Sequence, residues 1–339
     1  MEASPSATPA FPPYRDLLQR TDAPPGSSWG LFGKHDELGM VNFITAERVR
    51  YAAQLVKRGV CFNLDKALDA FDPPVARHRH KPRHTMFCNS PDHRDDYIDH
   101  FYPQGTTQVD SLRHFRHADH GFYNRVRDED IKPGSPTIGV NRYAERGIVG
   151  RGVLIDIDRY LTQRGRKLDH RAGEAFAVNL LDDVAAAQGV RFMPGDILLM
   201  RTGWMACYFN DMSPEERTLL PSALKSTGLL QARETVEWLW DHQIAVGASD
   251  NAGFEAIPSV AQSPFVSMRD QAAGADPIHA GLMHPTLIAL LGLCIGELWD
   301  LEALAADCAA TGVYECMVSC KPLNLTGGVG SPANAIAVV

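Results

Sequence analysis

Apolar residues recur at helical spacing early in the chain. Within residues 45–59, the apolar positions from Val49 to Val56 return every three or four residues and therefore share one face of a helix. Thr45 is a suitable N-cap, because its hydroxyl can accept a hydrogen bond from a free N–H of the first turn, and Gly59 is placed to end the helix. We therefore predict a helix in this segment.

Short apolar runs bounded by glycine are typical of buried strands. Residues 152–157 and 195–201 have this form, and residues 244–248 predict a third strand that leads into Ser249-Asp250-Asn251. Helices are expected over 174–188, after the capping-box sequence Ser213-Pro214-Glu215-Glu216, and over 230–242, 285–291 and 301–310. Residues 312–339 predict two strands around a Gly-rich turn. Strands that alternate with helices in this way indicate an α/β layered fold.

Two segments depart from this alternation. Residues 1–27 are rich in Pro, Ser and Ala and predict an N-terminal arm, whereas 28–339 predict one continuously folded domain. Residues 73–124 are dense in His, Asp and Pro and have weak periodicity, so we expect loops and short strands there. Because binding and catalytic residues favour loops on a rigid scaffold, we expect the chemistry in this segment.

Composition narrows the class of protein. The chain has 339 residues, 45% of them hydrophobic, and its 33 Lys and Arg against 41 Asp and Glu argue against a nucleic-acid partner. No apolar run reaches the roughly 18 residues of a membrane span, and the first residues lack the pattern of a signal peptide, so we expect a cytoplasmic protein without a membrane partner. The seven cysteines form no CxxC pair, and no GK[ST] follows the Gly-rich turn, so neither a zinc ribbon nor a nucleotide site is expected.

The sequence QGTTQVDSLRH gathers four polar side chains, Gln104, Gln108, Asp110 and His114. In an extended segment, positions two or four apart lie on the same side, so these side chains can converge. A carboxylate beside an imidazole is the pair that a water-activating hydrolase needs, either as metal ligand and general base or as an orienting pair. The alternative is a hydrogen-bonded loop without catalytic function.

A second group lies far away in the sequence. His284 begins an apolar stretch that ends at Glu297. A buried carboxylate costs several kcal/mol without a partner, so Glu297 should meet a cation, a metal ion or a proton donor. The alternative is a glutamate at the end of an element that faces water.

Other polar and aromatic residues are weaker candidates. The histidines of the basic tract 77–84, which ends at His84, resemble a metal tract, but the interleaved Arg and Lys would repel a cation, so a solvated loop or a rim that contacts anionic substrate is expected. His117 is a candidate for the pocket lining, with a plain loop as the equal alternative. Trp29 and Phe32 are candidates for the pocket wall, although a core position suits them better.

Seven landmarks together resemble the cyclase superfamily of metal-dependent hydrolases, which includes kynurenine formamidases and isatin hydrolases. They are SSWGLFGKHDELGMVNFIT (27–45), QGTTQVDSLRH (104–114), RGVLIDI (151–157), PGDILLMRTGW (194–204), SDNAGFEAIP (249–258), the segment 284–297 and GGVGSPANAIAV (327–338). The resemblance implies a mainly β core flanked by helices, of the swivelling β/α/β type. A homodimer or homotetramer is expected, with the N-terminal arm crossing to a neighbour.

The hallmark of that family is HxGTHxDxPxH, in which the first two His and the Asp bind a divalent metal and the last His is the catalytic acid or base. Asp110 and His114 match the Asp and the final His, whereas Gln104 and Gln108 stand where the two metal-binding His are expected. Family members with two metals use the shared Asp, a later His and a Glu for the second ion, and Asp110, His284 and Glu297 match all three.

The resemblance therefore implies a hydrolase of a small cyclic or acyl amide or a lactone, with a small-molecule substrate. We expect one divalent ion, Mn²⁺ or Zn²⁺, held by Asp110, His284 and Glu297, with Gln104 and Gln108 either completing its shell or binding substrate. A metal-free site, in which His114 and Asp110 activate water, stays open. So do a lyase or cyclase of secondary metabolism and a catalytically inactive small-molecule-binding relative.

Overall fold

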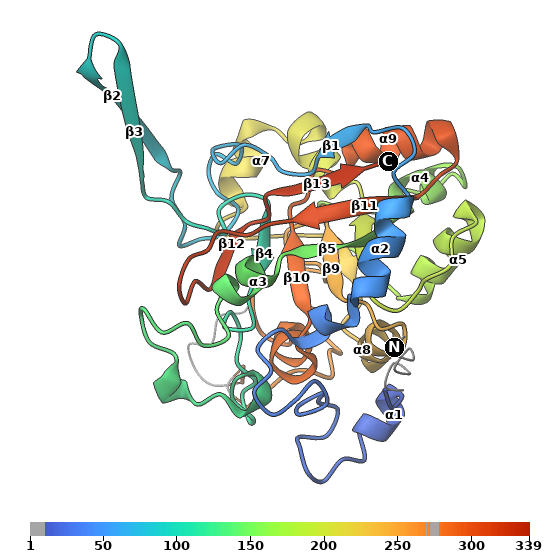
Figure 1. Ribbon diagram of the computed structural model, residues 1–339. Helices are drawn as coiled ribbons and strands as arrows, with labels where there is room; N and C mark the ends of the chain where they lie inside the picture. The colour runs from blue at the N-terminus through green and yellow to red at the C-terminus, as the bar shows by residue number, and fades with distance from the viewer. Residues whose placement is uncertain (1–10, 269, 272–277) are drawn as a thin grey trace, which may run out of the picture.

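A nine-stranded mixed sheet forms the centre of the molecule in the computed structural model, which describes residues 11–268, 270–271 and 278–339 (Figure 1). Its order is β1-β13-β11-β5-β7-β9-β10-β4-β12, and β5, β7, β9 and β10 run parallel at its middle. Helices flank this curled sheet, so the α/β class with a mainly β core is confirmed.

The strands are β1 (Cys61–Asn63), β2 (Arg83–Ser90), β3 (His93–Asp99), β4 (Gln108–Asp110), β5 (Ile148–Asp156), β6 (Ala175–Phe176), β7 (Ile197–Arg201), β8 (Gly228–Leu229), β9 (Val246–Ser249), β10 (Cys294–Glu297), β11 (Glu315–Cys320), β12 (Gly330–Pro332) and β13 (Ala335–Val338). Strands β2 and β3 form a separate two-stranded sheet, as do β6 and β8.

The α-helices are α1 (Tyr14–Leu17), α2 (Ala46–Gln54), α3 (Val140–Arg146), α4 (Ile157–Thr162), α5 (Asn179–Gln188), α6 (Trp204–Ala206), α7 (Pro214–Leu219), α8 (Arg233–Asp241) and α9 (Glu302–Thr311). Shorter 3₁₀ turns are η1 (Gly39–Phe43), η2 (Tyr123–Arg125) and η3 (Asp128–Asp130), and π-helical turns are η4 (Cys207–Asp211) and η5 (Pro285–Leu291). Among the described residues, each helix is too short or too polar to cross a lipid bilayer.

Local sequence signals explain the helix starts better than the helix ends. The Thr45 hydroxyl accepts from the backbone N–H of Arg48 and begins α2, and Ser213 begins α7 with a complete capping box. Helix α2 ends at Gln54, before Gly59, and the backbone N–H groups of Arg58 and Val60 donate to the carbonyl of Val339 instead of to a helical partner. These hydrogen bonds to Val339 replace those that a longer helix would form.

Two other segments form elements that differ from the predicted ones. The helix expected over 174–188 begins only at Asn179, because Ala175–Phe176 pairs with Gly228–Leu229 as a short parallel sheet. The carboxyl-terminal segment forms three strands instead of two, since the Gly-rich turn is followed by β12, which pairs with β4, before β13 begins.

The polar tract 73–124 contains more regular structure than expected. Strands β2 and β3 form a hairpin of eight and seven residues that stands out from the body of the molecule (Figure 1). This hairpin covers residues 83–99.

The described part of the N-terminal arm, residues 11–27, packs against α8 of its own chain. The backbone N–H of Tyr14 donates to Oδ1 of Asp241 at 2.7 Å, and the indole N–H of Trp240 donates to the carbonyl of Pro12 at 2.8 Å. Residues 1–10 of the predicted arm lie outside the described residues.

Candidate active site

The register of two strands, β4 and β10, places three polar side chains on one face of the sheet. Strand β10 pairs with β4 so that Glu297 lies opposite Gln108, and residues directly opposite in an antiparallel pair point to the same side. Asp110 follows two positions after Gln108 and therefore shares that face. The exposed fraction of Asp110 is 1%, so its carboxyl group lies inside the protein.

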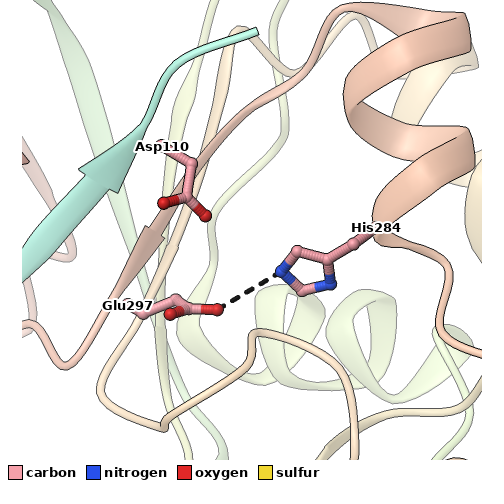
Figure 2. A group of neighbouring side chains, drawn as sticks. All are labelled: Asp110, His284 and Glu297. Atoms are coloured by element: carbon pink, nitrogen blue, oxygen red, sulfur yellow. Dashed lines mark hydrogen bonds and ion pairs between the residues drawn. The ribbon is translucent and has the colours of Figure 1, made fainter. Parts of the chain in front are cut away.

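His284 reaches the same place from a different element. It precedes the π-helical turn η5, and its imidazole points toward Glu297 and Asp110 (Figure 2). Its Nε2 lies 3.3 Å from Oε1 of Glu297. One ligand atom from each of Asp110, His284 and Glu297 lies within 4.8 Å of the others. The three side chains for which a metal site is predicted thus converge.

Each of the two carboxylates has one oxygen occupied by a glutamine amide. Gln104 Nε2 donates to Oδ1 of Asp110 at 2.5 Å, and Gln108 Nε2 donates to Oε2 of Glu297. The other Asp110 oxygen, Oδ2, is buried and has no hydrogen-bond partner among the described residues. The amides therefore leave one oxygen of each carboxylate facing His284.

Glu255 holds His284 in place from behind. Its Oε1 lies 2.6 Å from Nδ1 of His284 and accepts the backbone N–H of the same residue at 2.9 Å. Its Oε2 accepts from the backbone of Met283 and the amide of Gln231. Histidine ligands of metals are oriented by such outer carboxylates. This role of Glu255 was not predicted, although Glu255 lies in the SDNAGFEAIP segment together with Asp250.

Asp250, in the same segment as Glu255, stabilises a turn and does not contact His284. It accepts hydrogen bonds from the backbone N–H and hydroxyl of Thr202 and from the backbone N–H of Gly203, at 2.7 to 2.9 Å. It thereby fixes the turn after β7. Burial raises the pKa of Asp250 to about 6.

The two carboxylates around His284 determine its protonation. Burial alone would lower the pKa of His284, but hydrogen bonds and charge from Glu255 and Glu297 raise that pKa to about 10. Burial likewise opposes ionisation of Glu297, yet the hydrogen bond and charge of His284 bring its pKa below the usual range. Without a metal ion, His284 is therefore a cation between two carboxylates.

The pKa of Asp110 is raised, whereas that of Glu297 is lowered. The pKa of His114 is lowered, whereas that of His284 is raised. Burial and the neighbouring charge of Glu297 raise the pKa of Asp110 to about 7. Burial and the nearby His284 cation lower the pKa of His114 to about 3, so its imidazole is neutral. His114 Nε2 lies 3.9 Å from Oδ2 of Asp110, and Nδ1 lies 3.4 Å from the Gln104 amide nitrogen.

Arg79 is a second site residue that was not predicted individually. Its Nη1 donates to the backbone carbonyl of Gln104 and lies 3.5 Å from the side-chain Oε1 of Gln108. Burial lowers the pKa of Arg79, while the charges of Glu297 and Asp110 oppose that shift. Arg79 belongs to the basic tract 77–84, and this contact sets it apart from the other basic residues of that tract.

A cavity of about 80 Å³ opens beside these groups. Its polar lining is Arg79, His114, His279, His284 and Glu297. Its apolar lining includes Val75, Phe115, Leu224, Ile257, Leu282 and Leu298. An adjoining hollow of about 310 Å³ shares Phe115, His279 and Leu282 with it. The two cavities therefore lie side by side, with these three residues in common.

Of the other predicted substrate-binding residues, His117 lies near the cavity and His84 does not. His117 lines the adjoining hollow and stacks on His120 with ring centroids 4.9 Å apart. His84 lies in the hairpin of β2 and β3 and pairs with Asp96 at 2.8 Å, with most of its side chain exposed. The structure thus does not bring His84 to the cavity.

The two aromatic candidates pack elsewhere. Trp29 is buried in the core and donates its indole N–H to the carbonyl of Ala289 at 2.7 Å. Phe32 packs edge-on against Phe43 with centroids 5.1 Å apart and lines a separate cavity of about 500 Å³. Neither lines the cavity beside His284.

The donor set fits one divalent ion. A buried carboxylate oxygen without a partner, a second carboxylate and an imidazole nitrogen converge at Asp110, Glu297 and His284. Two carboxylates and one imidazole suit Mn²⁺ or Zn²⁺ and leave positions for water. Gln104 and Gln108 present amide nitrogens to the carboxylates, and an amide N–H is a donor, not a metal ligand.

Comparisons with known proteins show the family of this chain. The family described as "Putative cyclase" matches residues 65–256. A crystal structure described as a novel cyclase is 33% identical, with a TM-score of 0.76, and the match covers 92% of this chain and 99% of that chain. A comparison with curated protein sequences gave no significant match.

Two isatin hydrolase structures share the fold at low identity. Isatin hydrolase A from Labrenzia aggregata, bound to benzyl benzoate, is 17% identical with a TM-score of 0.52, and the match covers 84% of this chain and 94% of that chain. Isatin hydrolase A from Ralstonia solanacearum is 16% identical with a TM-score of 0.53, and the corresponding coverages are 83% and 92%.

Proposed function

This chain belongs to the cyclase family, and on that basis we propose that it is a metal-dependent hydrolase that opens a small cyclic or acyl amide or a lactone. The observation that carries the proposal is the unpartnered buried oxygen of Asp110, which faces a carboxylate and an imidazole. An orphaned acceptor of this kind costs free energy unless a cation or a proton donor satisfies it. The neutral imidazole of His114 lies beside the same oxygen.

Asp110, Glu297 and His284 would hold the ion, with Mn²⁺ or Zn²⁺ as the fitting choices. When bound, such an ion polarises a carbonyl and lowers the pKa of water. Glu255 fixes the ring of His284 through Nδ1 and so keeps Nε2 directed at the site.

His114 is the group that moves the proton. Its pKa is lowered to about 3, so the imidazole is neutral before the reaction. It would take a proton from water and, as a strong acid once protonated, return that proton to the leaving nitrogen or oxygen. Its Nδ1 lies 3.4 Å from the amide nitrogen of Gln104, which is a donor, and its Nε2 lies 3.9 Å from Oδ2 of Asp110, so without a metal ion the tautomer with the proton on Nε2 matches both neighbours. The ring of Phe115 packs edge-on against His114 at 4.6 Å and limits its rotation.

Arg79 is suited to bind the oxygen on which negative charge develops. Within the described chain, its Nη1 is used by Gln104 and Gln108, and no hydrogen bond uses Nε or Nη2. The guanidinium lines the cavity among apolar side chains. In such surroundings, a charged donor stabilises a developing oxyanion more strongly than it does in water.

The reaction type can be tested directly. Purified protein loaded with Mn²⁺ or Zn²⁺ is incubated with a panel of small aryl amides, cyclic amides and lactones in water enriched in ¹⁸O, and products are analysed by mass spectrometry. We expect a carboxylic acid product that carries one ¹⁸O, and no product after chelator treatment.

Two other outcomes correspond to the alternative functions. Product without ¹⁸O indicates a lyase or cyclase, because neither reaction consumes water. Tight binding of panel compounds without turnover, with or without metal, indicates an inactive binding protein. Full activity in chelator with ¹⁸O incorporation indicates hydrolysis by His114 and Asp110 alone, without the ion.

A further inference from the structure

The cavity of about 500 Å³ that Phe32 lines is separate from the site around His284. The two cavities share no lining residue. The larger one is lined by residues of the N-terminal segment, of the first turn of α2 and of the turn before β7. Its volume lies in the range of small-molecule sites, roughly 300 to 1,000 Å³. The proposed reaction makes no use of this cavity.

Three phenylalanine rings form the apolar part of the lining. Phe11, Phe32 and Phe43 have ring centroids 5.0 to 5.1 Å from one another. The buried ring of Trp240 packs against Phe43 with centroids 5.5 Å apart and supports this group. Phe11 and Phe32 are only half-buried in the single chain. Because aromatic rings pair through their faces and edges, this part of the cavity favours an aromatic ligand.

Arg48 of α2 supplies a positive charge to the same cavity. It is half-buried and lines the cavity, and its guanidinium has no hydrogen-bond or ion-pair partner within the described part of the chain. Arg146 of α3 approaches the same segment, but its guanidinium donates to the carbonyls of Ile44 and Gly147. Arg48 is therefore a cation that is free to bind an anion in the cavity.

Gly195 holds the stem of Arg48 beside the aromatic residues. Its φ is +86°, and a Cβ there would lie 2.5 Å from the carbonyl oxygen of Phe43 and 3.4 Å from Cγ of Arg48. A glycine at this position thus lets the turn before β7 pack closely on both residues. The preceding residue, Pro194, lines the cavity. The charge of Arg48 and the phenylalanine rings can therefore act on one ligand.

We propose that this cavity binds a small aromatic carboxylate, with its ring among the phenylalanines and its carboxylate on Arg48. A planar guanidinium matches a carboxylate, because it can donate two parallel hydrogen bonds to it. Glu47 also lines the cavity, but it is exposed, so water and salt screen its repulsion of an anion. The inference does not depend on which reaction the site around His284 performs.

The test is titration calorimetry of the full chain with 2-naphthoate and with its uncharged counterpart, naphthalene-2-carboxamide. Chelator is present throughout, so that no metal ion can hold the carboxylate at the other site. We expect one 2-naphthoate to bind per chain with a dissociation constant of about 1 mM or lower. The carboxamide should bind at least about tenfold more weakly, because it lacks the charge that Arg48 recognises.

Four single variants locate the bound carboxylate. Arg48→Gln should weaken 2-naphthoate binding at least about tenfold, whereas Glu47→Gln should tighten it about two- to threefold by removing a like charge. Arg50→Gln is the matched control, because Arg50 is an exposed residue of the same helix and does not line the cavity. Arg79→Gln should also leave the affinity unchanged, since Arg79 lines the other cavity. Equal urea midpoints for the four variants show that each one is folded.

Several results would overturn the proposal. These are no binding of 2-naphthoate, equal affinities for the carboxylate and the carboxamide, and binding that Arg79→Gln weakens while Arg48→Gln does not. Weaker binding after Glu47→Gln would also overturn it, because the cavity would then favour a cationic group. A protein that binds Mn²⁺ and hydrolyses amides but not 2-naphthoate would remove this inference and leave the proposed reaction standing. Binding of 2-naphthoate by a protein without metal binding or activity would do the opposite.

Discussion

The amide nitrogen of Gln104 lies 2.5 Å from Oδ1 of Asp110 and donates a hydrogen bond to it. Gln108 does the same for Oε2 of Glu297. Family members place metal-binding histidines at these two positions of the motif, whereas here both positions supply donors. The two amides, together with the Arg79 guanidinium, therefore occupy one side of the carboxylate pair with hydrogen bonds and positive charge, and the other side is left for a single ion.

We predict that the protein binds one divalent ion per chain. The variant Gln104→His with Gln108→His should still bind one, because Arg79 keeps positive charge beside both imidazoles. Adding Arg79→Gln to that variant should raise the stoichiometry to two. Titration calorimetry with Mn²⁺ and elemental analysis after dialysis measure the number directly.

The outcome depends on Arg79 specifically. Arg79→Gln by itself should leave one ion bound, since the two glutamine amides are not ligands. Two ions in the unchanged protein, or two in the double histidine variant, would show that the guanidinium does not exclude the second ion.

Glu255→Gln should weaken metal binding about 10- to 100-fold, the usual effect of removing a carboxylate that orients a histidine ligand. The substitution keeps the size of the side chain but removes the charged acceptor 2.6 Å from Nδ1 of His284. Calorimetry with Mn²⁺ gives the affinity. Glu302→Gln is the control, because Glu302 pairs with Arg201 outside the site, and its affinity should match that of the unchanged protein. Equal affinity in the Glu255 variant would contradict the orienting role.

His114→Ala should reduce kcat at least 100-fold and leave the affinity for Mn²⁺ within twofold. The imidazole transfers a proton but supplies no ligand atom to the group Asp110, His284 and Glu297. Steady-state kinetics and calorimetry separate the two effects. His35→Ala removes an exposed imidazole and should change neither. Loss of metal binding in the His114 variant would instead make that residue a ligand.

Metal affinity should rise with pH, and it should rise more steeply below about pH 7 than above. The pKa of Asp110 is raised to about 7, so below that pH the metal-free protein holds a proton on Asp110 that the ion must displace. The pKa of His284 is raised to about 10, so its proton must also leave throughout the range from pH 6 to 8.5. Two protons are displaced below pH 7 and one above it.

Titrations with Mn²⁺ in buffers of different ionisation enthalpy measure that proton release. An affinity that does not change between pH 6 and 8.5 would show that neither group carries a proton in the metal-free protein.

The sequence was informative about the site where chemistry and spacing agree. The alternation in the 104–114 segment placed Gln108 and Asp110 on one side, and the buried position of Glu297 required a partner. The structure brings these groups together with His284. Capping residues such as Thr45 located helix starts, because an N-cap depends on atoms three residues away.

Contacts between distant segments were not accessible in this way. Glu255 meets His284 across 29 residues, and no local pattern distinguishes it from Asp250 in the same turn. Arg79 is one of several basic residues in its tract, and the path of the chain alone decides which of them turns inward. The hairpin of β2 and β3 is a similar case, since the weak periodicity of residues 73–124 does not show whether a strand lies on a sheet or extends away from it.

Gly152 should be intolerant of a methyl group, whereas Gly150 on the same strand should accept one. A Cβ at Gly152 would lie 2.4 Å from Cγ2 of Val318, because β11 pairs directly beside it, while a Cβ at Gly150 would meet nothing closer than 3.4 Å. Gly152→Ala should therefore lower the free energy of unfolding by about 1 to 3 kcal/mol. Gly150→Ala should leave it unchanged or raise it by less than about 1 kcal/mol, since alanine restricts the unfolded chain. Urea unfolding with equal m-values measures both. Mn²⁺ affinity should be unchanged in both variants, because β7 and β9 lie between β5 and Glu297 of β10. Equal stability of the two variants would show that β5 and β11 can separate locally without cost.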